Sequence, residues 1–428
     1  MLNLILAVLV PFLVTTAEEQ TASNIEVVEI FRAETTEELE ASLTDGYPMP
    51  WLEEILNDES IPEEDRYWLD CRVRAVIAQD LHLFYDEEGS PVYVDADWIV
   101  PGENYWRENF IVNPVGEPFV YNSPDMPTHV RSEPGFIVNR FGEEIGQLAL
   151  TNRFIRLSRD GTIGVTCSDV QLEGIVAATS RATNVCILYP DGSFIEIPIG
   201  YSAGGNYAIS NDGNTIVAAS YLSADSTEYP EEGGILWILD RDGNIRKRFE
   251  TSTHPCASIS PAVSANGKYV ACQQYPSHSA VYLLEGETGE LLHRFEDNIV
   301  GNNLHFAPNE RYLCVGGYEW PLIFDCDNLR EVWSMELTED FIGNSFLNCD
   351  NSAQLIAIRM SCITDPGTPA IFEQHLYRIN ENNMCILGNE KGSTQLSPNG
   401  SFTLSHGYLI YRPLLRVPLI INQVNGGE

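Results

Sequence analysis

Residues 207–220 read YAISNDGNTIVAAS and residues 261–274 read PAVSANGKYVACQQ, and this pattern decides the fold. Each stretch alternates apolar and polar positions, passes through a turn rich in Asn, Asp and Gly, and then alternates again. Alternation with a period of two predicts β-strands, and such turn residues between two strands predict a hairpin. Each stretch therefore predicts one antiparallel pair of strands.

The same unit recurs along most of the chain. The intervals between the residues directly before the seven turns are 45, 52, 54, 43, 42 and 48 positions. These residues are Asn113, Ser158, Ser210, Ser264, Ala307, Cys349 and Ser397. Repeats of about 40 to 50 residues are typical of the four-stranded blades of a propeller.

Most copies continue into a second hairpin, as in ILWILDRDGNIRKRF from Ile235 and AVYLLEGETGELLHRF from Ala280. A four-stranded sheet cannot bury both of its faces alone, but sheets stacked around a ring bury one another. The repeats therefore predict an all-β, seven-bladed β-propeller over residues 91–428. We expect the ring to close through the C-terminal strands alone or through a strand borrowed from Val92–Val100.

Over roughly residues 92–428 the chain resembles the seven-bladed β-propellers of the WD-like and PQQ-like repeat superfamily. The motif from Glu287 to Leu292, ETGELL, is similar to the Thr-Gly hairpin of PQQ-type repeats. The resemblance implies the fold. It implies little about activity, because propellers carry many unrelated functions.

Charge divides the chain into two parts. The 428 residues contain 24 Lys and Arg against 62 Asp and Glu, a formal net charge of −38. Residues 18–90 hold 21 acidic and 4 basic side chains, and residues 91–428 hold 41 and 20. A negative field repels phosphate backbones and anionic lipid surfaces, so we expect no nucleic-acid partner.

The N-terminus has the pattern of an export signal. Met1–Val14 is rich in apolar residues but too short to span a bilayer, and small residues precede Glu18. We predict a signal peptide over residues 1–17 and an acidic, partly helical segment over residues 18–90; the alternative for Met1–Val14 is a buried strand or helix. The mature chain is expected to be secreted or periplasmic, without a transmembrane segment.

Two helices are predicted in the acidic segment. Trp51–Asn57 predicts a short helix, and Ser60 with Glu63 forms a capping-box pattern at the start of a longer one. An apolar stripe follows on one face of this longer helix: Leu69, Val73, Val76, Ile77, Leu81 and Phe84. A stripe of this kind cannot be buried by one helix, so we expect the helix to dock on the propeller.

The ten cysteines have no Cys-x-x-Cys spacing, which argues against a redox motif or a zinc knuckle. Five of them lie inside strand-like segments, where a free thiol behaves as a small apolar group: Cys167, Cys186, Cys272, Cys314 and Cys326. We predict buried thiols. One or two disulfides remain an alternative for an exported chain, and their pairing does not follow from the sequence.

Three patterns resemble catalytic or metal sites, and each has a simpler explanation. Gly200–Gly204 (GYSAG) matches a serine nucleophile elbow, but repeat strands rather than a helix follow it. Asp240–Asn244 and Asp325–Asn328 alternate carboxylates as calcium loops do, but both occupy hairpin turns and lack the distal Glu. The eight histidines are scattered, so we assign no catalytic residue, metal site or cofactor.

Two insertions, Ser223–Gly233 and Ser361–Gln374, lengthen the loops between second and third strands of their blades. In a propeller these loops share a face with the connections between blades, and loops on a rigid scaffold carry function. The candidate ligand- or partner-binding residues on this loop face are Asp225, Glu228, Tyr229, Glu231, Glu232, Asp365 and Phe372.

The sequence therefore predicts an exported, monomeric, non-enzymatic β-propeller that binds a protein or another extracellular ligand through its loop face. The alternative is a propeller enzyme, such as a hydrolase, lyase or quinone-dependent dehydrogenase, with an active site in its central channel. Ionisable side chains clustered around the axis would favour the enzyme.

Overall fold

The structure is a computed structural model of the whole chain. It describes residues 25–42, 49–81, 83–85, 91–93, 119–121, 135–138, 144–148, 156–158, 163–170, 181–189, 193–202, 207–221, 234–251, 258–275, 280–295, 303–316, 320–335, 346–362, 371–379, 383–388, 393–409 and 412–425. This part of the chain is mostly β-structure, in small antiparallel sheets that are compatible with a propeller-like fold.

Three sheets consist of four strands in chain order. The first contains β15 (Ser258–Val263), β16 (Tyr269–Tyr275), β17 (Ala280–Glu285) and β18 (Leu291–Arg294). The second contains β19 (Asn303–Phe306), β20 (Tyr312–Gly316), β21 (Leu322–Asp325) and β22 (Arg330–Ser334). The third contains β23 (Phe346–Cys349), β24 (Leu355–Cys362), β25 (Ile371–Arg378) and β26 (Asn383–Gly388).

A larger sheet combines two such units. One contains β7 (Arg156–Leu157), β8 (Gly164–Val170), β9 (Arg181–Leu188) and β10 (Phe194–Ser202), and the other contains β11 (Tyr207–Ile209), β12 (Ile216–Tyr221), β13 (Gly234–Leu239) and β14 (Ile245–Glu250). A single pair of residues, Tyr201 and Tyr221, joins them. The two units therefore repeat the four-stranded plan of the other sheets.

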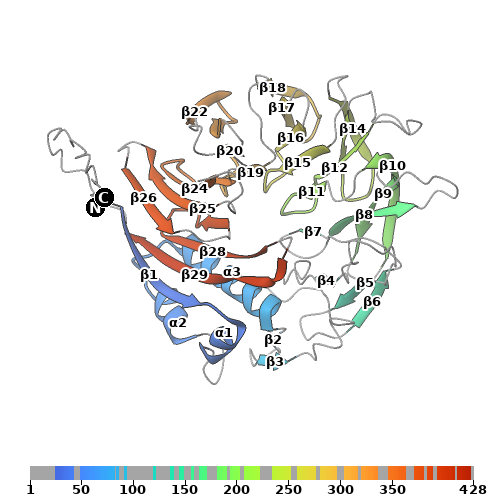
Figure 1. The fold of residues 1–428 in the computed structure, drawn as a ribbon. Helices are drawn as coiled ribbons and strands as arrows, with labels where there is room; N and C mark the ends of the chain where they lie inside the picture. The colour runs from blue at the N-terminus through green and yellow to red at the C-terminus, as the bar shows by residue number, and fades with distance from the viewer. Residues whose placement is uncertain are drawn as a thin grey trace, which may run out of the picture.

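The smaller sheets come from earlier in the chain. They are β2 (Leu83–Tyr85) with β3 (Pro91–Tyr93), and β4 (Phe119–Tyr121) with β5 (Gly135–Val138) and β6 (Glu144–Leu148). Figure 1 shows the sheets arranged around a common centre, with β7, β11, β15 and β19 near it. The innermost strands β11, β15, β19 and β23 contact one another in succession.

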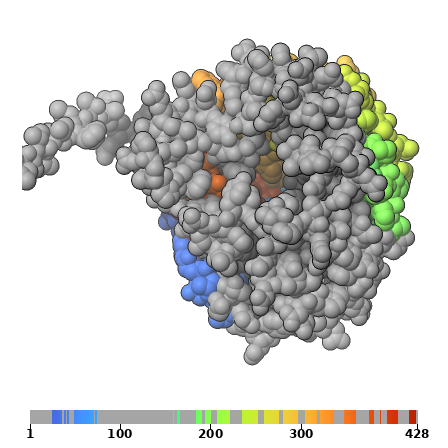
Figure 2. Space-filling model, turned by 45° about the vertical axis from the view of Figure 1, so that its right-hand side comes forward, coloured from blue at the N-terminus to red at the C-terminus, as the bar shows by residue number. Residues whose placement is uncertain are grey.

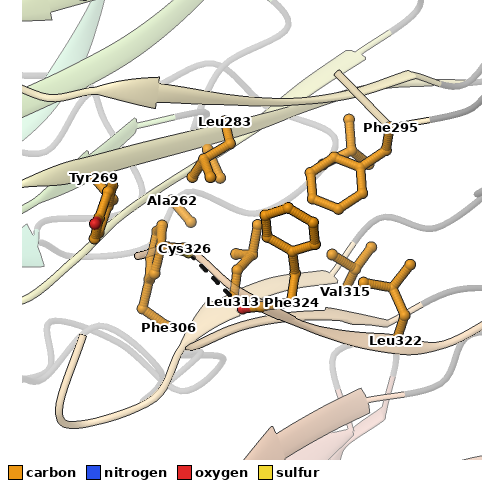
Figure 3. Close-up of a cluster of buried hydrophobic side chains, with 12 residues drawn as sticks. Ala262, Tyr269, Leu283, Phe295, Phe306, Leu313, Val315, Leu322, Phe324 and Cys326 are labelled. Carbon is orange, nitrogen blue, oxygen red and sulfur yellow. Dashed lines mark hydrogen bonds between the residues drawn. The ribbon is translucent and has the colours of Figure 1, made fainter. Parts of the chain in front are cut away.

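The hydrophobic core is divided among the spaces between neighbouring sheets. One cluster joins side chains of β15–β18 to side chains of β19–β21, and Figure 3 shows Leu283 and Phe295 facing Phe324 and Leu313 across this space. Similar clusters fill the spaces before and after it. Each sheet therefore depends on its neighbours to cover its two apolar faces.

Three helices lie between the first strand and the small sheets: α1 (Thr36–Ser42), α2 (Pro50–Leu56) and α3 (Glu63–Leu81). The sequence predicted α2 and α3, whereas α1 was not predicted. The capping box at Ser60 is wrong, because the Ser60 hydroxyl donates to Asp58 Oδ1 at 2.6 Å. The helix begins instead with the N–H groups of Asp65 and Arg66 donating to the Pro62 carbonyl oxygen.

The last sheet is completed by the first strand. β27 (Ser393–Leu396), β28 (Phe402–Leu409) and β29 (Arg412–Asn425) are followed at the outer edge by β1 (Glu26–Ala33). β1 pairs antiparallel with β29, from Glu26 opposite Asn425 to Ala33 opposite Leu419. The predicted closure through the C-terminal strands alone, or through Val92–Val100, is therefore wrong. A strand from the acidic segment occupies that edge.

The helices pack on the face of the sheet that β1 completes. The predicted stripe begins as expected, with Leu69 and Val73 fully buried, while the side chains of Val76, Ile77 and Leu81 lie outside the described part. The placement of Phe84 on this helix is wrong, because the helix ends at Leu81 and Phe84 lies in β2. Apolar residues of the helices and of the sheet form one cluster: Leu39, Met49, Leu52, Ile61, Leu69, Val73, Phe402, Leu404, Leu419 and Ile421. Figure 2 shows this helical segment at the surface, on the side opposite the strands coloured green.

Candidate functional site

Antiparallel pairing sorts the links between strands onto two ends of the ring. The links from first to second strand and from third to fourth strand lie at one end, which we call the turn end. The links from second to third strand and from one sheet to the next lie at the other, the connection end. Among strands β7 to β29, links at the turn end contain 4 to 6 residues, and links at the connection end contain 2 to 12.

Turns of the turn end are built by local hydrogen bonds. Ser210 Oγ accepts the Thr215 N–H at 2.9 Å, and Ser264 Oγ accepts the Tyr269 N–H at 2.9 Å. The fourth turn residue has a positive φ, which is +70° at Gly213 and +73° at Gly267. Glycine adopts this conformation without steric cost, which is why the Asn-Gly and Asp-Gly patterns predicted these hairpins.

The sixth repeat shifts this pattern by one residue. Asp350, rather than the predicted Cys349, takes the serine position, since its Oδ1 accepts the Leu355 N–H at 3.0 Å. Ala353 then holds the positive φ of +52° that glycine holds elsewhere. A carboxylate oxygen replaces the hydroxyl oxygen because both accept an N–H in the same turn geometry.

Neighbouring turns also bond to one another around the ring. The Asn211 N–H donates to the Ala265 carbonyl oxygen at 2.6 Å, and the Asn351 N–H donates to the Pro398 carbonyl oxygen at 2.6 Å. Between them, Asn309 Nδ2 donates to the Asn351 carbonyl oxygen. The turn end is therefore a connected, short-looped surface in which backbone groups already have protein partners.

The first of the two predicted calcium-like loops is turn structure. Asp240 Oδ1 accepts the N–H groups of Asp242 and Asn244 at 3.0 and 2.8 Å. Asp240 Oδ2 accepts Asn244 Nδ2 at 2.9 Å. Both carboxylate oxygens are therefore used within the turn.

The second loop is held by basic side chains. Arg311 Nε donates to Asp325 Oδ1 at 3.1 Å, and its terminal nitrogen lies 2.5 Å from Asp325 Oδ2. Lys268 Nζ and the Tyr269 hydroxyl donate to Asp327 Oδ1 at 2.7 and 2.6 Å. The Arg311 guanidinium lowers the pKa of Asp325, and its carboxylate is only 1% exposed. Within the described residues, no group of three or more His, Cys, Asp or Glu side chains could hold a metal ion.

The serine-elbow match belongs to a strand. Ser202 is the last residue of β10, and β11 begins at Tyr207. The strand–turn–helix geometry that exposes a nucleophile is therefore not formed here.

Equivalent positions of the innermost strands carry few ionisable groups in the part of the chain that the structure describes. Two residues before each turn, the innermost strands β7, β11, β15, β19, β23 and β27 carry Arg156, Ala208, Ala262, His305, Asn348 and Gln395. Asn348 spans to the next strand, donating to the Thr394 carbonyl oxygen at 2.6 Å and accepting the Leu396 N–H at 3.2 Å. These positions are therefore mostly apolar or amide.

The ionisable members of this set are Arg156, whose side chain lies outside the described part, and His305. The His305 imidazole is solvent-accessible, but it is surrounded by protein and lies near the Arg72 guanidinium of α3, and these two effects lower its pKa to about 4. It is therefore neutral at pH 7.

The predicted binding residues belong to the connection end. Asp225, Glu228, Tyr229, Glu231 and Glu232 fall in residues 222–233, between β12 and β13, and Asp365 falls in residues 363–370, between β24 and β25. These two links lie outside the described residues. Phe372 is corrected from loop to strand, since it lies in β25 with its Cα opposite Ser361.

The cysteine prediction is confirmed where side chains are described. Cys186, Cys272, Cys314, Cys326 and Cys349 are buried thiols that form no disulfide in the structure. The Cys167 side chain lies outside the described part. Burial raises the pKa of Cys326 to about 12, so this thiol stays protonated and unreactive at neutral pH.

None of the described helices is long and apolar enough to cross a membrane.

Comparisons with known proteins assign no family to this chain. No family model matches the chain, and no curated protein matches it. A solved structure titled as the crystal structure of the eukaryotic initiation factor is 11% identical, with a TM-score of 0.47, over 73% of this chain and 74% of that one. The Kuenenia stuttgartiensis hydrazine synthase is 11% identical, with a TM-score of 0.40, over 58% of this chain and 72% of that one. Likenesses at this level carry no information about function.

Proposed function

We propose that this chain is an exported, non-enzymatic, seven-bladed β-propeller that binds a protein partner as a monomer through its connection end. The export proposal rests on the apolar Met1–Val14 run and the small residues after it. The five four-stranded units from β7 to β26, the sheet of β27–β29 with β1, and the sheet of β4–β6 account for the seven blades of the proposal.

The difference between the two ends of the ring is the observation that carries the binding proposal. At the turn end the links are short, similar in length and bonded to one another, as the Asn211 and Asn351 N–H groups show. At the connection end the links vary in length up to the 12 residues between Tyr221 and Gly234. Variable links on a rigid scaffold are the usual carriers of recognition, because they change without disturbing the core.

Charge suggests the chemistry of the partner. The longest of these links reads LSADSTEYPEEG and contains four carboxylates and no base. Carboxylates at the rim of an interface attract a basic partner surface and raise its association rate. Tyr229 lies among them and supplies the aromatic group that interfaces favour. We therefore expect a partner with a basic patch.

Site-specific photocrosslinking in the native cells tests the proposal. A photoreactive residue placed at Tyr229 or Asp365 is expected to yield the same protein adduct from both positions. The matched controls are exposed positions of the turn end, Asn244 and Glu287, which should yield no such adduct. Adducts at the turn end alone, or none at either end, would contradict recognition through the connection end.

A second measurement tests whether the loop carboxylates contribute to partner binding. Replacing Asp225, Glu228, Glu231 and Glu232 by their amides should weaken binding of the crosslinked partner about tenfold or more at low salt, and the difference should shrink as salt rises. An unchanged affinity would contradict the basic-patch partner. Turnover of a small molecule by the purified chain would favour the enzyme alternative instead.

A further inference from the structure

Two thiols from neighbouring sheets meet inside the ring. Cys314 lies on β20 and Cys349 lies at the end of β23, and their Sγ atoms are 3.5 Å apart. Both residues are buried, with exposed fractions of 0% and 1%. They belong to one cluster of apolar side chains that joins the two sheets. The contact therefore crosses a boundary between sheets rather than lying within one.

The other three described thiols lie elsewhere, and Cys272 belongs to the apolar cluster formed by β12, β13, β15, β16 and β17. Cys326 Sγ lies 3.9 Å from the Phe324 carbonyl oxygen, and its side chain faces the cluster on the other side of the sheet. Cys186 Sγ lies 3.7 Å from Glu196 Oε1 in a distant unit of the ring. Cys314 and Cys349 are thus a defined pair, which the sequence could not identify.

We propose that Cys314 and Cys349 form a disulfide bond that staples the two neighbouring sheets when the chain folds in the presence of a disulfide oxidant. A disulfide has a sulfur–sulfur length of about 2.05 Å, so the two atoms must approach by about 1.5 Å. The proposal requires that rotation of the two side chains closes this distance. The residues that pack around the pair keep both sulfur atoms facing each other.

The chemistry is thiol–disulfide exchange with a small disulfide such as oxidised glutathione. The thiolate of one cysteine attacks the oxidant, a mixed disulfide forms, and one glutathione leaves as a thiolate. The second cysteine then attacks the mixed disulfide and releases the second glutathione. The two cysteines lose two protons and two electrons, and the oxidant becomes two molecules of reduced glutathione.

Exchange must occur before the core closes. In the folded chain the contact with Cys314 and burial hold the pKa of Cys349 well above its usual value, so almost no thiolate is present at neutral pH. In the unfolded chain both thiols have ordinary acidity and are open to the oxidant. We therefore expect oxidation during folding and slow oxidation of the folded, reduced chain.

Refolding in two redox conditions tests the proposal. The full chain is unfolded with reductant and refolded either with a mixture of reduced and oxidised glutathione or with reductant alone. Free thiols are alkylated, and the chain is digested without reduction and mapped by mass spectrometry. The oxidised sample should contain a peptide pair linked through Cys314 and Cys349, and the reduced sample should contain both residues alkylated.

Stability is the second readout. The link closes a loop of about 35 residues, so the melting temperature of the oxidised chain should exceed that of the reduced chain by on the order of 5 °C. The variant Cys349→Ala should lose both the linked peptide and the difference in melting temperature. The matched control Cys326→Ala also removes a buried thiol but should keep both.

Several results would overturn the proposal. Alkylation of both cysteines after oxidative refolding, or a link from Cys314 to any other cysteine, would show that the pair does not close. A linked pair without a rise in melting temperature would remove the stapling role. If Cys349→Ala fails to fold, the peptide map of the unmodified chain still decides between these results.

Discussion

The carboxylate of Asp65, on α3, accepts the N–H of Asn399 at 2.8 Å and the N–H of Ser401 at 3.1 Å, although the residues lie more than 330 positions apart. Asp65 is fully buried, and Asn399 and Ser401 belong to the hairpin turn between β27 and β28. A helix of the N-terminal segment is therefore bonded to the last hairpin turn of the described chain.

Replacing Asp65 by Ala should destabilise the chain strongly. The substitution leaves two N–H groups of the last turn without acceptors in a buried place, and hydrogen bonds to a charged group contribute about 1.5–3 kcal/mol each. We expect a loss of about 3 kcal/mol in the free energy of unfolding, measured by denaturant titration. The control is Glu63→Ala, which removes an exposed neighbouring carboxylate. An equal loss in both variants would contradict the specific role of Asp65.

Docking of α3 on the last sheet can be tested at Leu69, which is fully buried. Leu69→Ala should lower the free energy of unfolding by about 2–5 kcal/mol, because it removes apolar contacts and leaves a cavity. The same substitution at Leu291, which is 45% exposed, is the matched control and should cost less than about 1 kcal/mol. Similar losses at the two positions would mean that the stripe of α3 does not pack as the structure has it.

A chain that begins near residue 91 should fold poorly. It lacks β1, so β29 presents an unpaired edge, and it lacks the helices that cover Phe402 and Leu419. An open edge with an apolar face beside it promotes aggregation. We expect a melting temperature at least several degrees lower, together with aggregation in light scattering. An unchanged melting temperature would make the N-terminal segment dispensable for closure.

Gly267 is a turn glycine with little room for a side chain. It has a φ of +73°, and a Cβ placed on it would overlap Thr215 Oγ1 of the neighbouring unit. Gly267→Ala should therefore cost about 2–4 kcal/mol, part of it from the backbone conformation and part from the overlap. Gly243→Ala shares the positive φ, at +83°, but meets only a side-chain methyl at 3.0 Å. Gly243→Ala should therefore destabilise the fold about half as much as Gly267→Ala, as measured by thermal unfolding. Equal destabilisation by the two variants would mean that the overlap with Thr215 contributes nothing.

Protonation of Asp325 in acid should destabilise the fold. The Arg311 guanidinium and the bonds from Asn328 lower the pKa of Asp325 in the folded state. The unfolded pKa of an Asp is about 3.9. Because the folded pKa of Asp325 is lower, the ionised carboxylate stabilises the fold at pH values above about 3.9, and this stabilisation is lost as the pH falls towards the folded pKa. The melting temperature should therefore drop more steeply between about pH 5 and pH 2 in the unmodified chain than in Asp325→Asn. The exposed turn carboxylate of Asp242 provides the control substitution, and parallel curves for Asp325→Asn and the unmodified chain would contradict this assignment.

The repeating hairpins were readable from the sequence because they depend on neighbours only a few residues away. A serine five positions before the N–H that it accepts, and a glycine with positive φ between them, define the turns at Ser210 and Ser264 without help from the rest of the chain. Alternation of apolar residues added the strands. The one misplaced repeat, at Cys349, failed because Asp350 makes the same bond with a different side chain.

For the candidate binding residues, too, the sequence predicted one feature and missed another. Their place at the connection end follows from the order of the strands, which the sequence predicted. The sequence analysis placed Phe372 in a loop because the apolar residues after Pro369 do not indicate at which residue β25 begins. Strand ends depend on the pairing partner, here Ser361, and pairing is a tertiary contact.

By itself, the sequence determined the strands, most of their turns, two of the helices and the likeness to a propeller. Only the tertiary structure decided that β1 completes the sheet of β29, that Asp65 holds the last turn, and that Cys314 faces Cys349. The physical reason is the range of the interactions. Turns and periodic faces are set within a few residues, whereas ring closure and the pairing of thiols depend on contacts between segments that meet only when the sheets have packed against one another.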